Sequence, residues 1–358
     1  MTTDAMMILD THPGEIIKEH MEDLGWSQRD LAQRLGVLPK TVHQLIYHKT
    51  RIDRDYAEAF SRIFGHSVNF WLNLEKVWED NERLKTAESE AKKHKTELTR
   101  FCYPELVKSG LIKDGCYFLE KVNTLLGFFR VANFEALSGI VESNSALYRR
   151  RSTKAATNET LAVWIMACER VSEQVGVDVE YSEKAFRAAL DSIRQNMLLG
   201  NIDFAKLKEI CANAGVAVVS ISPFKGLGVY GASFWHNKKP VIALAWNYSD
   251  DRFWFYFFHE AAHILFDPQK EIFTESKVGA CVDESEVKAN AFSENKLLPD
   301  FDADRFRHPS QDVIKKYASQ MHVHPGIVLG RLKNKQLINN SAFQNLVLKT
   351  PPVYDTLV

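Results

Sequence analysis

The chain has 358 residues, which is too long for one ordinary domain and indicates two or three. Hydrophobic residues make up 45% and charged residues 25% of the sequence, a composition that excludes an intrinsically disordered chain. The formal net charge of −1 favours neither nucleic acid nor a membrane as a partner of the whole protein, so local charge has to decide.

The five cysteines are too widely spaced for a disulfide framework or a thiolate zinc finger, so we expect free thiols in a reducing compartment. The first ten residues have neither the basic start nor the apolar core of a signal peptide. The apolar run Phe253–Phe258 is far too short to span a membrane. We therefore predict a cytoplasmic protein without a membrane partner.

Residues 27–46 predict two short helices joined by a tight turn. Ser27 is a good N-cap for the first helix, and Asp30 at the third helical position completes a capping box. Gly36 is suited to end that helix because glycine adopts positive φ readily. Leu38 and Pro39 then start a second helix, Lys40–Ile46. The small core between the two helices is predicted from Leu31, Ala32, Val37, Val42 and Leu45.

The stretch from about His12 to Trp78 resembles the phage-repressor type of helix-turn-helix domain, and within it the HigA antitoxin group. The resemblance implies that the second helix enters the major groove of operator DNA and that the protein is a homodimer. It implies base contacts for Lys40, His43 and Gln44, and phosphate contacts for Gln28, Lys49, Thr50 and Arg51. Lysine and glutamine can read purine edges, and lysine and arginine neutralise phosphate. The alternative is the same fold used only for protein contacts.

The middle of the chain predicts helices. The polar stretch Glu88–Lys95 lacks glycine and proline, which favours a solvated helical connector. Apolar residues at three- and four-residue spacing predict further helices over Glu159–Val175 and Ser182–Leu199. Two short stretches rich in β-branched residues, Val216–Ile221 and Pro240–Leu244, predict strands.

The sequence His259-Glu260-Ala261-Ala262-His263 indicates a metal site. On a helix, a spacing of four residues places both imidazoles on one face, where they can share one zinc ion. Glu260 can then reach a metal-bound water as a general base. The motif alone is weak, since a buried helix with two satisfied histidines has the same sequence pattern.

Three neighbouring features support the metal site. Glu286, with Asn290 one turn later, lies on a second predicted helix and offers a third ligand. Asp283 is a plausible cap for that helix. The segment Gly231–Phe234 with the strand Pro240–Leu244 is expected to form an edge strand that lines a peptide cleft.

Glu284 is a rival third ligand, although its position two residues from Glu286 points it elsewhere on a helix. Glu275 and Asp267 are expected to be solvated, and neither His322 nor Cys281 shows a particular signal.

Together these features resemble the ImmA/IrrE (DUF955) family of zinc peptidases, over roughly residues 200–335. The resemblance implies His259, His263 and Glu286 as zinc ligands and Glu260 as the catalytic base. Two departures are visible: Ala261-Ala262 replaces a Leu-Gly pair, and the stretch Ser293–Lys296 is unusually polar.

The segment around His324-Pro325-Gly326 also occurs in family members fused to this kind of helix-turn-helix domain. Two roles for His324 stay open: a catalytic one, stabilising an oxyanion at the zinc site, or a structural one, capping a helix or filling a turn.

The predicted fold is mainly α with a small β-sheet (α+β). It comprises a helix-turn-helix domain in residues 1–80, a helical connector in 81–200 and a zincin-like peptidase domain in 201–358. The first hypothesis is a DNA-binding regulator fused to a Zn²⁺-dependent endopeptidase that cleaves a regulatory protein, a repressor or an antitoxin, in a stress response. The second is a HigA-like antitoxin or repressor, with a toxin as partner, whose peptidase-like domain senses a signal or binds a partner.

Overall fold

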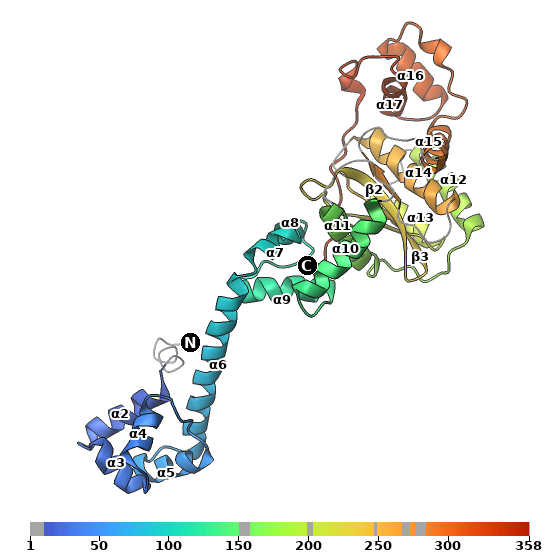
Figure 1. Cartoon of the computed structure of the whole chain (residues 1–358). Helices are drawn as coiled ribbons and strands as arrows, with labels where there is room; N and C mark the ends of the chain where they lie inside the picture. The colour runs from blue at the N-terminus through green and yellow to red at the C-terminus, as the bar shows by residue number, and fades with distance from the viewer. Residues whose placement is uncertain are drawn as a thin grey trace. The chain divides into compact units, whose positions relative to one another are not determined.

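The computed structural model describes residues 11–149, 158–198, 203–246, 249–266, 273–276 and 284–357. The chain forms two compact units (Figure 1). The first consists of Met1–His94 with Tyr117–Leu119, and the second of Lys95–Cys116 with Glu120–Val358. The prediction of a mainly helical chain with a small sheet is confirmed. The three-domain division with boundaries near residues 80 and 200 stays a prediction.

The first unit is a helical bundle around one apolar core. Its described helices are α2 (Pro13–Asp23), α3 (Gln28–Leu35), α4 (Pro39–Ile46), α5 (Arg54–Phe64) and α6 (Val68–Lys92). Phe60 and Trp71 are fully buried at its centre. Of the core predicted between α3 and α4, Leu31, Ala32, Val42 and Leu45 are buried, and Val37 packs against them half-buried.

The polar stretch that was predicted to be helical forms the second half of α6, which runs without interruption to Lys92, and the start of α7 (Lys95–Arg100). Oppositely charged side chains three residues apart line its surface, such as Lys85 with Glu82 and Lys93 with Glu90. Pairs at this spacing favour a helix that is exposed to solvent.

The second unit begins with helices and ends with helices. The first group is α7, α8 (Tyr103–Lys108), α9 (Phe118–Phe129, whose first two residues belong to the first unit), α10 (Phe134–Arg149), α11 (Asn158–Ser172), α12 (Glu183–Leu198) and α13 (Phe204–Ala212). After the sheet come α14 (Asp250–Phe266), α15 (Glu284–Leu297), η1 (Ala303–Phe306), α16 (Gln311–Gln320), α17 (Pro325–Asn334) and η2 (Gln344–Leu346). Helices α11 and α12 match the two predicted in the middle of the chain.

A four-stranded sheet lies at the centre of the second unit. Its strands are β1 (Ala217–Ser220), β2 (Val229–His236), β3 (Lys239–Leu244) and β4 (Phe273–Ser276), in the order β1-β3-β2-β4. Strands β1 and β3 are parallel, whereas β2 is antiparallel to both β3 and β4. Strands β1 and β3 correspond to the two predicted from sequence.

The expectation that Gly231–Phe234 and Pro240–Leu244 form an edge strand is wrong. Strand β3 lies between β1 and β2, and β4 covers the other side of β2, so both segments are interior. Strand β4 follows α14 in the chain, and its short sequence lacks a run of β-branched residues that would have predicted it.

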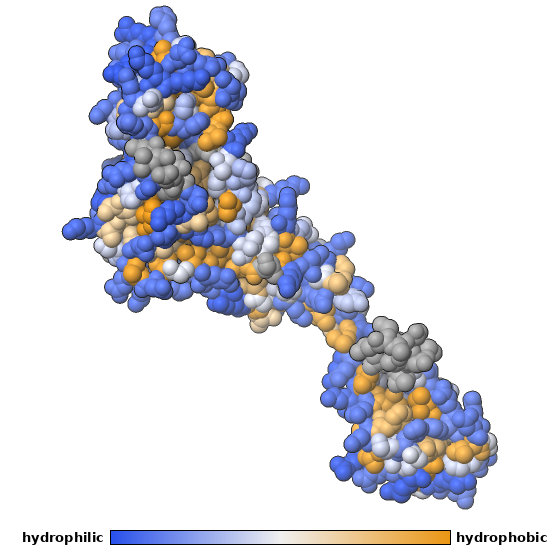
Figure 2. All heavy atoms as spheres, turned by 180° about the vertical axis from the view of Figure 1, so that it is seen from behind, coloured by the Kyte–Doolittle hydropathy of each residue, from blue (hydrophilic) through white to orange (hydrophobic). Residues whose placement is uncertain are grey.

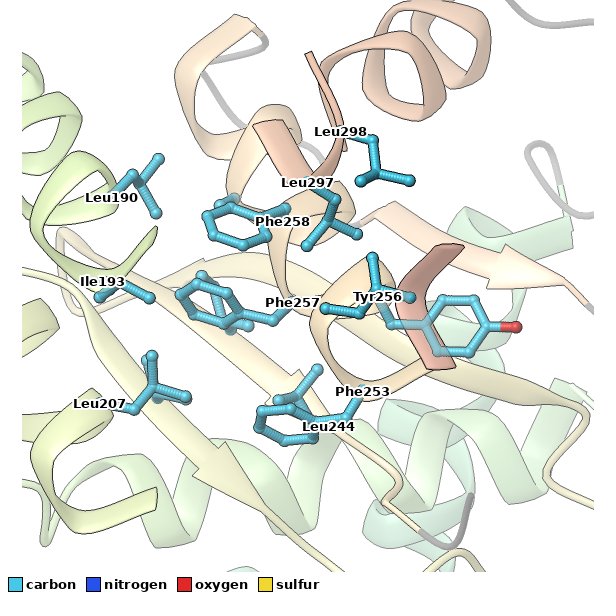
Figure 3. Close-up of a cluster of buried hydrophobic side chains, with 14 of the residues drawn as sticks. Leu190, Ile193, Leu207, Leu244, Phe253, Tyr256, Phe257, Phe258, Leu297 and Leu298 are labelled. Carbon is cyan, nitrogen blue, oxygen red and sulfur yellow. The ribbon is translucent and has the colours of Figure 1, made fainter. Parts of the chain in front are cut away.

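Helices cover both faces of the sheet. Alternate residues of a strand point to opposite faces, so Val218, Ile242 and Leu244 join the core beneath α14. The intervening residues face α11, whose segment 161–168 is buried throughout. Figure 3 shows how Phe257 and Phe258 of α14 lie among side chains of α12, α13 and α15. This aromatic packing fixes the helix that carries the histidine motif.

Figure 2 shows one face of each unit, where hydrophilic side chains are interrupted by apolar ones. Among the described residues, no single helix has both the length and the apolar composition of a membrane span. In the described part of the chain, one bent pair of helices, α9 with Phe134–Asn144 at 43°, meets both criteria together. Cys102, Cys116, Cys168 and Cys211 are free thiols, as predicted, and Cys281 lies outside the described residues.

Candidate metal centre and DNA interface

Helix α14 places His259, Glu260 and His263 in the interior of the second unit. The exposed fractions of these residues are 0%, 0% and 1%, so their polar atoms have to be satisfied within the protein. Ala261 and Ala262 are fully buried as well. The two alanines therefore pack closely in place of the Leu-Gly pair, as expected.

The two imidazoles and the Glu286 carboxyl group converge. The Nε2 atoms of His259 and His263 lie 3.1 Å apart. Glu286, on α15, places Oε2 at 3.4 Å from the first Nε2 and Oε1 at 3.4 Å from the second. One ligand atom from each residue lies within 4.8 Å of the others. A zinc ion, whose bonds to such ligands are about 2.0–2.2 Å long, fits this donor set.

Polar side chains of α15 lie within hydrogen-bond distance of the Nδ1 atoms of both histidines. His259 Nδ1 lies 3.1 Å from Asn290 Oδ1, and His263 Nδ1 lies 3.3 Å from Ser285 Oγ. An Nδ1–H that donates to each oxygen leaves the lone pair on Nε2. Two such lone pairs facing each other repel, so a cation between them stabilises this arrangement. Asn290 and Ser285 thus orient the rings toward a shared ion.

The contact of Asn290 with His259 was not predicted, although its position one turn after Glu286 was noted, and Ser285 was not predicted at all. This four-residue spacing is the signal for the role of the amide, because it places Glu286 and Asn290 on one face of α15. Ser293 on the same helix is buried, and its hydroxyl donates to the Phe255 carbonyl oxygen at 2.7 Å. The unusually polar stretch beginning at Ser293 therefore includes a buried contact between α15 and α14.

The Glu260 carboxyl group lies against β2. Ser233 Oγ donates to Glu260 Oε2 at 2.7 Å, whereas Oε1 has no hydrogen-bond partner. A Cβ at Gly231 would lie 3.1 Å from Glu260 Oε1, so the missing side chain at this position lets the carboxyl group approach the strand. Burial raises the pKa of Glu260 to about 7, although His259 and the Ser233 hydrogen bond act in the opposite direction. The group can exchange a proton near neutral pH.

The pKa of the Glu286 carboxyl group is shifted in the opposite direction from that of Glu260. Its side chain is 34% exposed. Burial raises the pKa of this carboxyl group, but the hydrogen bonds and charges of His259 and His263 outweigh burial and lower the pKa to about 2. It is therefore ionised at neutral pH, as a metal-binding carboxylate has to be.

The remaining candidates lie apart from this cluster or cannot be placed. Glu284 is 84% exposed and pairs with Lys288 at 2.9 Å, so the rival third ligand points away. His324 is the N-cap of α17, where its Nδ1 accepts from the Gly326 amide at 3.1 Å. The structure thus shows the capping role, and the catalytic role stays a prediction. Asp267, Cys281 and Asp283 lie outside the described residues.

Helices α3 and α4 form the predicted helix-turn-helix. The capping box is complete, with the Ser27 amide donating to Asp30 Oδ2 at 2.8 Å and the Asp30 amide donating to Ser27 Oγ at 3.3 Å. Gly36 ends α3 with φ 68°, a left-handed conformation that suits glycine. Leu38 is the N-cap of α4, and Pro39 is its first residue, as predicted.

One face of α4 and the loop after it remain available to a ligand. Val42, Leu45 and Ile46 point into the core, which leaves the predicted base-reading residues on the opposite side. The exposed members of the predicted DNA contacts are Lys40, His43, Lys49 and Arg51, and the partly exposed ones are Gln28, Gln44 and Thr50. They lie in α4, in the loop after it and at the start of α3, and their contacts with DNA stay a prediction.

Three features of this surface were not predicted. The Arg51 guanidinium contacts Glu79 of α6, so the free unit holds this side chain in an ion pair. Leu38 is 72% exposed at the start of α4. Tyr47 is 53% exposed, with Lys18 Nζ at 4.8 Å from its ring centroid. An exposed apolar side chain next to a recognition helix, such as that of Leu38, can contact a thymine methyl group.

Comparisons with known proteins match two separate parts of the chain. Residues 211–333 match the IrrE N-terminal-like domain, peptidase family M78. An uncharacterised HTH-type transcriptional regulator, YddM of Escherichia coli, is 33% identical over 76 residues, which are 21% of this chain and 81% of YddM. The chain belongs to the HTH-type regulators and carries a fused IrrE-like domain.

Other relatives of this fused regulator match a similar share of this chain. Virulence-associated protein I of Dichelobacter nodosus is 32% identical over 80 residues, covering 22% of this chain and 70% of that protein. A solved HigA-family addiction module antidote protein of Coxiella burnetii is 29% identical and covers 24% of this chain and 92% of its own, with a TM-score of 0.22. The solved antitoxin GraA is 32% identical and covers 25% of this chain and 90% of its own, with a TM-score of 0.20.

Proposed function

We propose that the fused regulator binds operator DNA as a homodimer through its first unit, and that its second unit is a zinc-dependent endopeptidase. The observation that supports the peptidase is the convergence of both Nε2 atoms and the Glu286 carboxylate beside the buried Glu260. Such a site suits hydrolysis because the proton acceptor Glu260 adjoins the metal ligand His259 on one helix.

In this proposal His259, His263 and Glu286 hold the zinc ion, which supplies Lewis-acid chemistry when bound. Glu260 accepts a proton at Oε1 from the water that attacks the peptide carbonyl carbon, and it returns the proton to the nitrogen of the leaving amine. Ser233 occupies Oε2 and so leaves Oε1 free of hydrogen bonds for this transfer.

The proposed substrate is a regulatory protein, either a repressor or an antitoxin. A peptidase joined to an operator-binding unit acts at high effective concentration on a protein bound nearby, so it does not need a tight cleft. The physiological trigger in this proposal is a stress that calls for removal of the regulator.

The test combines zinc analysis with cleavage of a co-expressed regulator. The purified full chain with stoichiometric zinc is expected to cut the regulator. Glu260→Gln should retain its zinc and lose cleavage, because an amide cannot accept the proton. Glu284→Gln is the matched control: it neutralises an exposed carboxylate on α15 and should leave cleavage unchanged. Equal cleavage by the wild type and Glu260→Gln, measured by mass spectrometry of the products, would exclude the proposed base.

DNA binding is supported by the exposed face of α4 and by the relatives. Several relatives are HTH-type transcriptional regulators, which we take as grounds for operator binding by this chain. In related domains two recognition helices read half-sites about one helical turn apart. We therefore propose an inverted repeat as the operator.

A second candidate function is favoured by the relatives that are antidote proteins or antitoxins. In this alternative the chain is a HigA-like antitoxin or repressor with a toxin as partner, and the second unit senses a signal through its metal ion with little proteolysis. Zinc binding without cleavage of any co-expressed regulator, together with co-purification of a toxin, would favour this alternative.

A further inference from the structure

A second group of metal-ligand side chains lies in the first unit, beside the proposed DNA-binding loop. It consists of His48, Glu75 and Glu79, whose ligand atoms all lie within 4.8 Å of one another. Glu75 and Glu79 are one turn apart on α6 and therefore share one of its faces. His48 follows α4 with φ 52°, a left-handed conformation that is uncommon for histidine.

The Glu75 carboxyl group is buried and incompletely satisfied. Its side chain is 8% exposed, and its Oε1 lies 2.8 Å from His48 Nε2. Its Oε2 is buried without a hydrogen-bond partner. A buried carboxylate oxygen without a partner is costly, so this oxygen calls for a proton donor or a cation.

Aromatic side chains hold the imidazole toward the glutamates. The His48 ring centroid lies 3.9 Å from that of Trp78 and 5.1 Å from that of His12. These contacts restrict the rotation of the His48 ring, and its Nε2 points to Glu75. The cluster is therefore an oriented set of one nitrogen and two carboxylate ligands, from the end of the proposed recognition helix and from α6.

We propose that His48, Glu75 and Glu79 bind a divalent first-row transition metal ion that competes with Arg51 for the Glu79 carboxylate. An imidazole with two carboxylates is a donor set that suits zinc, cobalt or manganese. Bonds of about 2.0–2.2 Å require ligand atoms no more than about 4.4 Å apart. The ligand atoms of the three side chains already lie within 4.8 Å of one another, so this condition calls for small side-chain rotations at most.

This second site links metal binding to DNA binding, so this part of the inference rests on the proposed DNA-binding function. Arg51 now contacts Glu79 through Nε and Nη2. Without metal, Arg51 supplies the positive charge beside Glu79. A bound metal ion supplies this charge instead, so the Arg51 guanidinium becomes available to a DNA phosphate. Because coupling between two binding sites is reciprocal, DNA should tighten the metal as much as the metal tightens DNA.

Metal binding is tested first, with Zn²⁺ and Co²⁺ as probes on the full chain. Equilibrium dialysis followed by elemental analysis should show one ion fewer per chain for His48→Ala and for Glu79→Gln than for the wild type. Glu90→Gln is the matched control: an exposed glutamate on the same helix that pairs with Lys93. His259→Ala should remove a different ion. The difference caused by Glu79→Gln therefore tests this site even if the proposed peptidase centre fails.

Glu75→Gln is a third variant in which the number of bound ions is measured. Because this change is buried, thermal unfolding without metal shows whether the variant keeps the fold. If it unfolds the unit, His48→Ala and Glu79→Gln decide. An unchanged ion count in both of these variants overturns the proposal, whereas a loss of one ion in both supports it.

The coupling is tested by DNA affinity at several salt concentrations, with and without Zn²⁺. Adding Zn²⁺ to the wild type should strengthen binding and steepen the dependence of log K on log salt by about 0.9, as one gained phosphate contact predicts. Glu79→Gln should bind DNA without metal as tightly as the wild type does with metal. Arg51→Ala should keep the metal and lose the metal effect on DNA. A Zn²⁺ effect that persists in Arg51→Ala would overturn the competition with Arg51.

Discussion

Each unit contains a histidine pair with nearly the same spacing. In the first unit the Nε2 atoms of His20 and His66 lie 3.0 Å apart, and in the second those of His259 and His263 lie 3.1 Å apart. The ring centroids are 4.9 Å and 4.8 Å apart. The surroundings differ, because Glu286 faces the second pair. His20 instead lies between His66 and the ring of Phe64, on which it stacks.

The difference shows that the spacing of two imidazoles does not by itself define a metal centre. With Glu286, two ring nitrogens and a carboxylate form a donor set for zinc, and both Nδ1 atoms are held by α15. Among the described residues, the first pair belongs to no such group of three ligands. Two neutral imidazoles at this distance are satisfied by one N–H···N hydrogen bond instead. The two pairs should therefore respond to different ions: zinc in the second unit and H⁺ in the first.

The largest expected effect is on zinc content. His259→Ala should remove one zinc ion per chain, because one histidine and one carboxylate hold zinc much more weakly than three ligands do. His20→Ala should leave the zinc content unchanged. Elemental analysis after dialysis against zinc-free buffer measures both. Equal zinc in His259→Ala and the wild type would show that the pair in α14 is an ordinary buried pair, and the comparison would fail.

The next effect concerns the residues that orient the rings. Asn290→Ala removes the partner of His259 Nδ1 and should weaken zinc binding by about 10- to 100-fold, as loss of such support does in other zinc sites. Asn295→Ala, at an exposed position of the same helix, is the control. Competition with a chromophoric chelator gives both affinities. An affinity unchanged by Asn290→Ala would mean that the helix alone orients the ring.

A third prediction concerns the surface through which the first unit is proposed to act. Gln44→Ala should reduce discrimination between the operator and a mismatched site by about 1–3 kcal/mol, because it removes a proposed base contact. Lys49→Ala should weaken binding to all sequences and lower the salt dependence by about one charge. Binding measured by fluorescence anisotropy at several salt concentrations separates the two. Identical, salt-independent effects would contradict the proposed orientation of α4.

Local signals predicted the elements that position both sites. The helix-turn-helix followed from Ser27, Asp30, Gly36 and Pro39, because caps and turns depend on neighbouring residues. The convergence of His259 with His263 followed from helical spacing in the same way. Contacts between distant segments, such as Ser233 with Glu260 or Arg51 with Glu79, depend on tertiary packing and left no pattern in the sequence.

A further local signal lies in a repeated triplet. The triplet His-Pro-Gly occurs at residues 12–14 and again at 324–326. In both cases the histidine caps a helix, and its Nδ1 accepts from the glycine amide, at 2.9 Å and 3.1 Å. The first copy lies in the unit without the proposed peptidase centre, so the repeat favours a structural role for His324. The order of the strands could not be predicted, because β4 is short and carries no clear strand pattern.

The smallest expected effect is a loss of stability of the first unit in acid, through His20. Burial lowers the pKa of His20, and His66 lowers it further, while Asp23 and Glu19 act in the opposite direction. The unfolded chain therefore takes up this proton at a higher pH than the folded unit does. The stability is complete above the unfolded pKa of about 6.5 and falls as the pH drops below it toward the lowered folded pKa.

His20→Gln should make the unfolding temperature of the first unit less dependent on pH below about 6.5, since glutamine does not titrate. Part of the dependence should remain, because burial also lowers the pKa of His12. His308→Gln, at an exposed position of the second unit, is the control and should leave the dependence unchanged. Calorimetry between pH 5 and pH 8 gives the comparison. A steeper loss of stability in His20→Gln than in the wild type would mean that the pair is stabilised by protonation, and its contrast with the metal-binding pair would disappear.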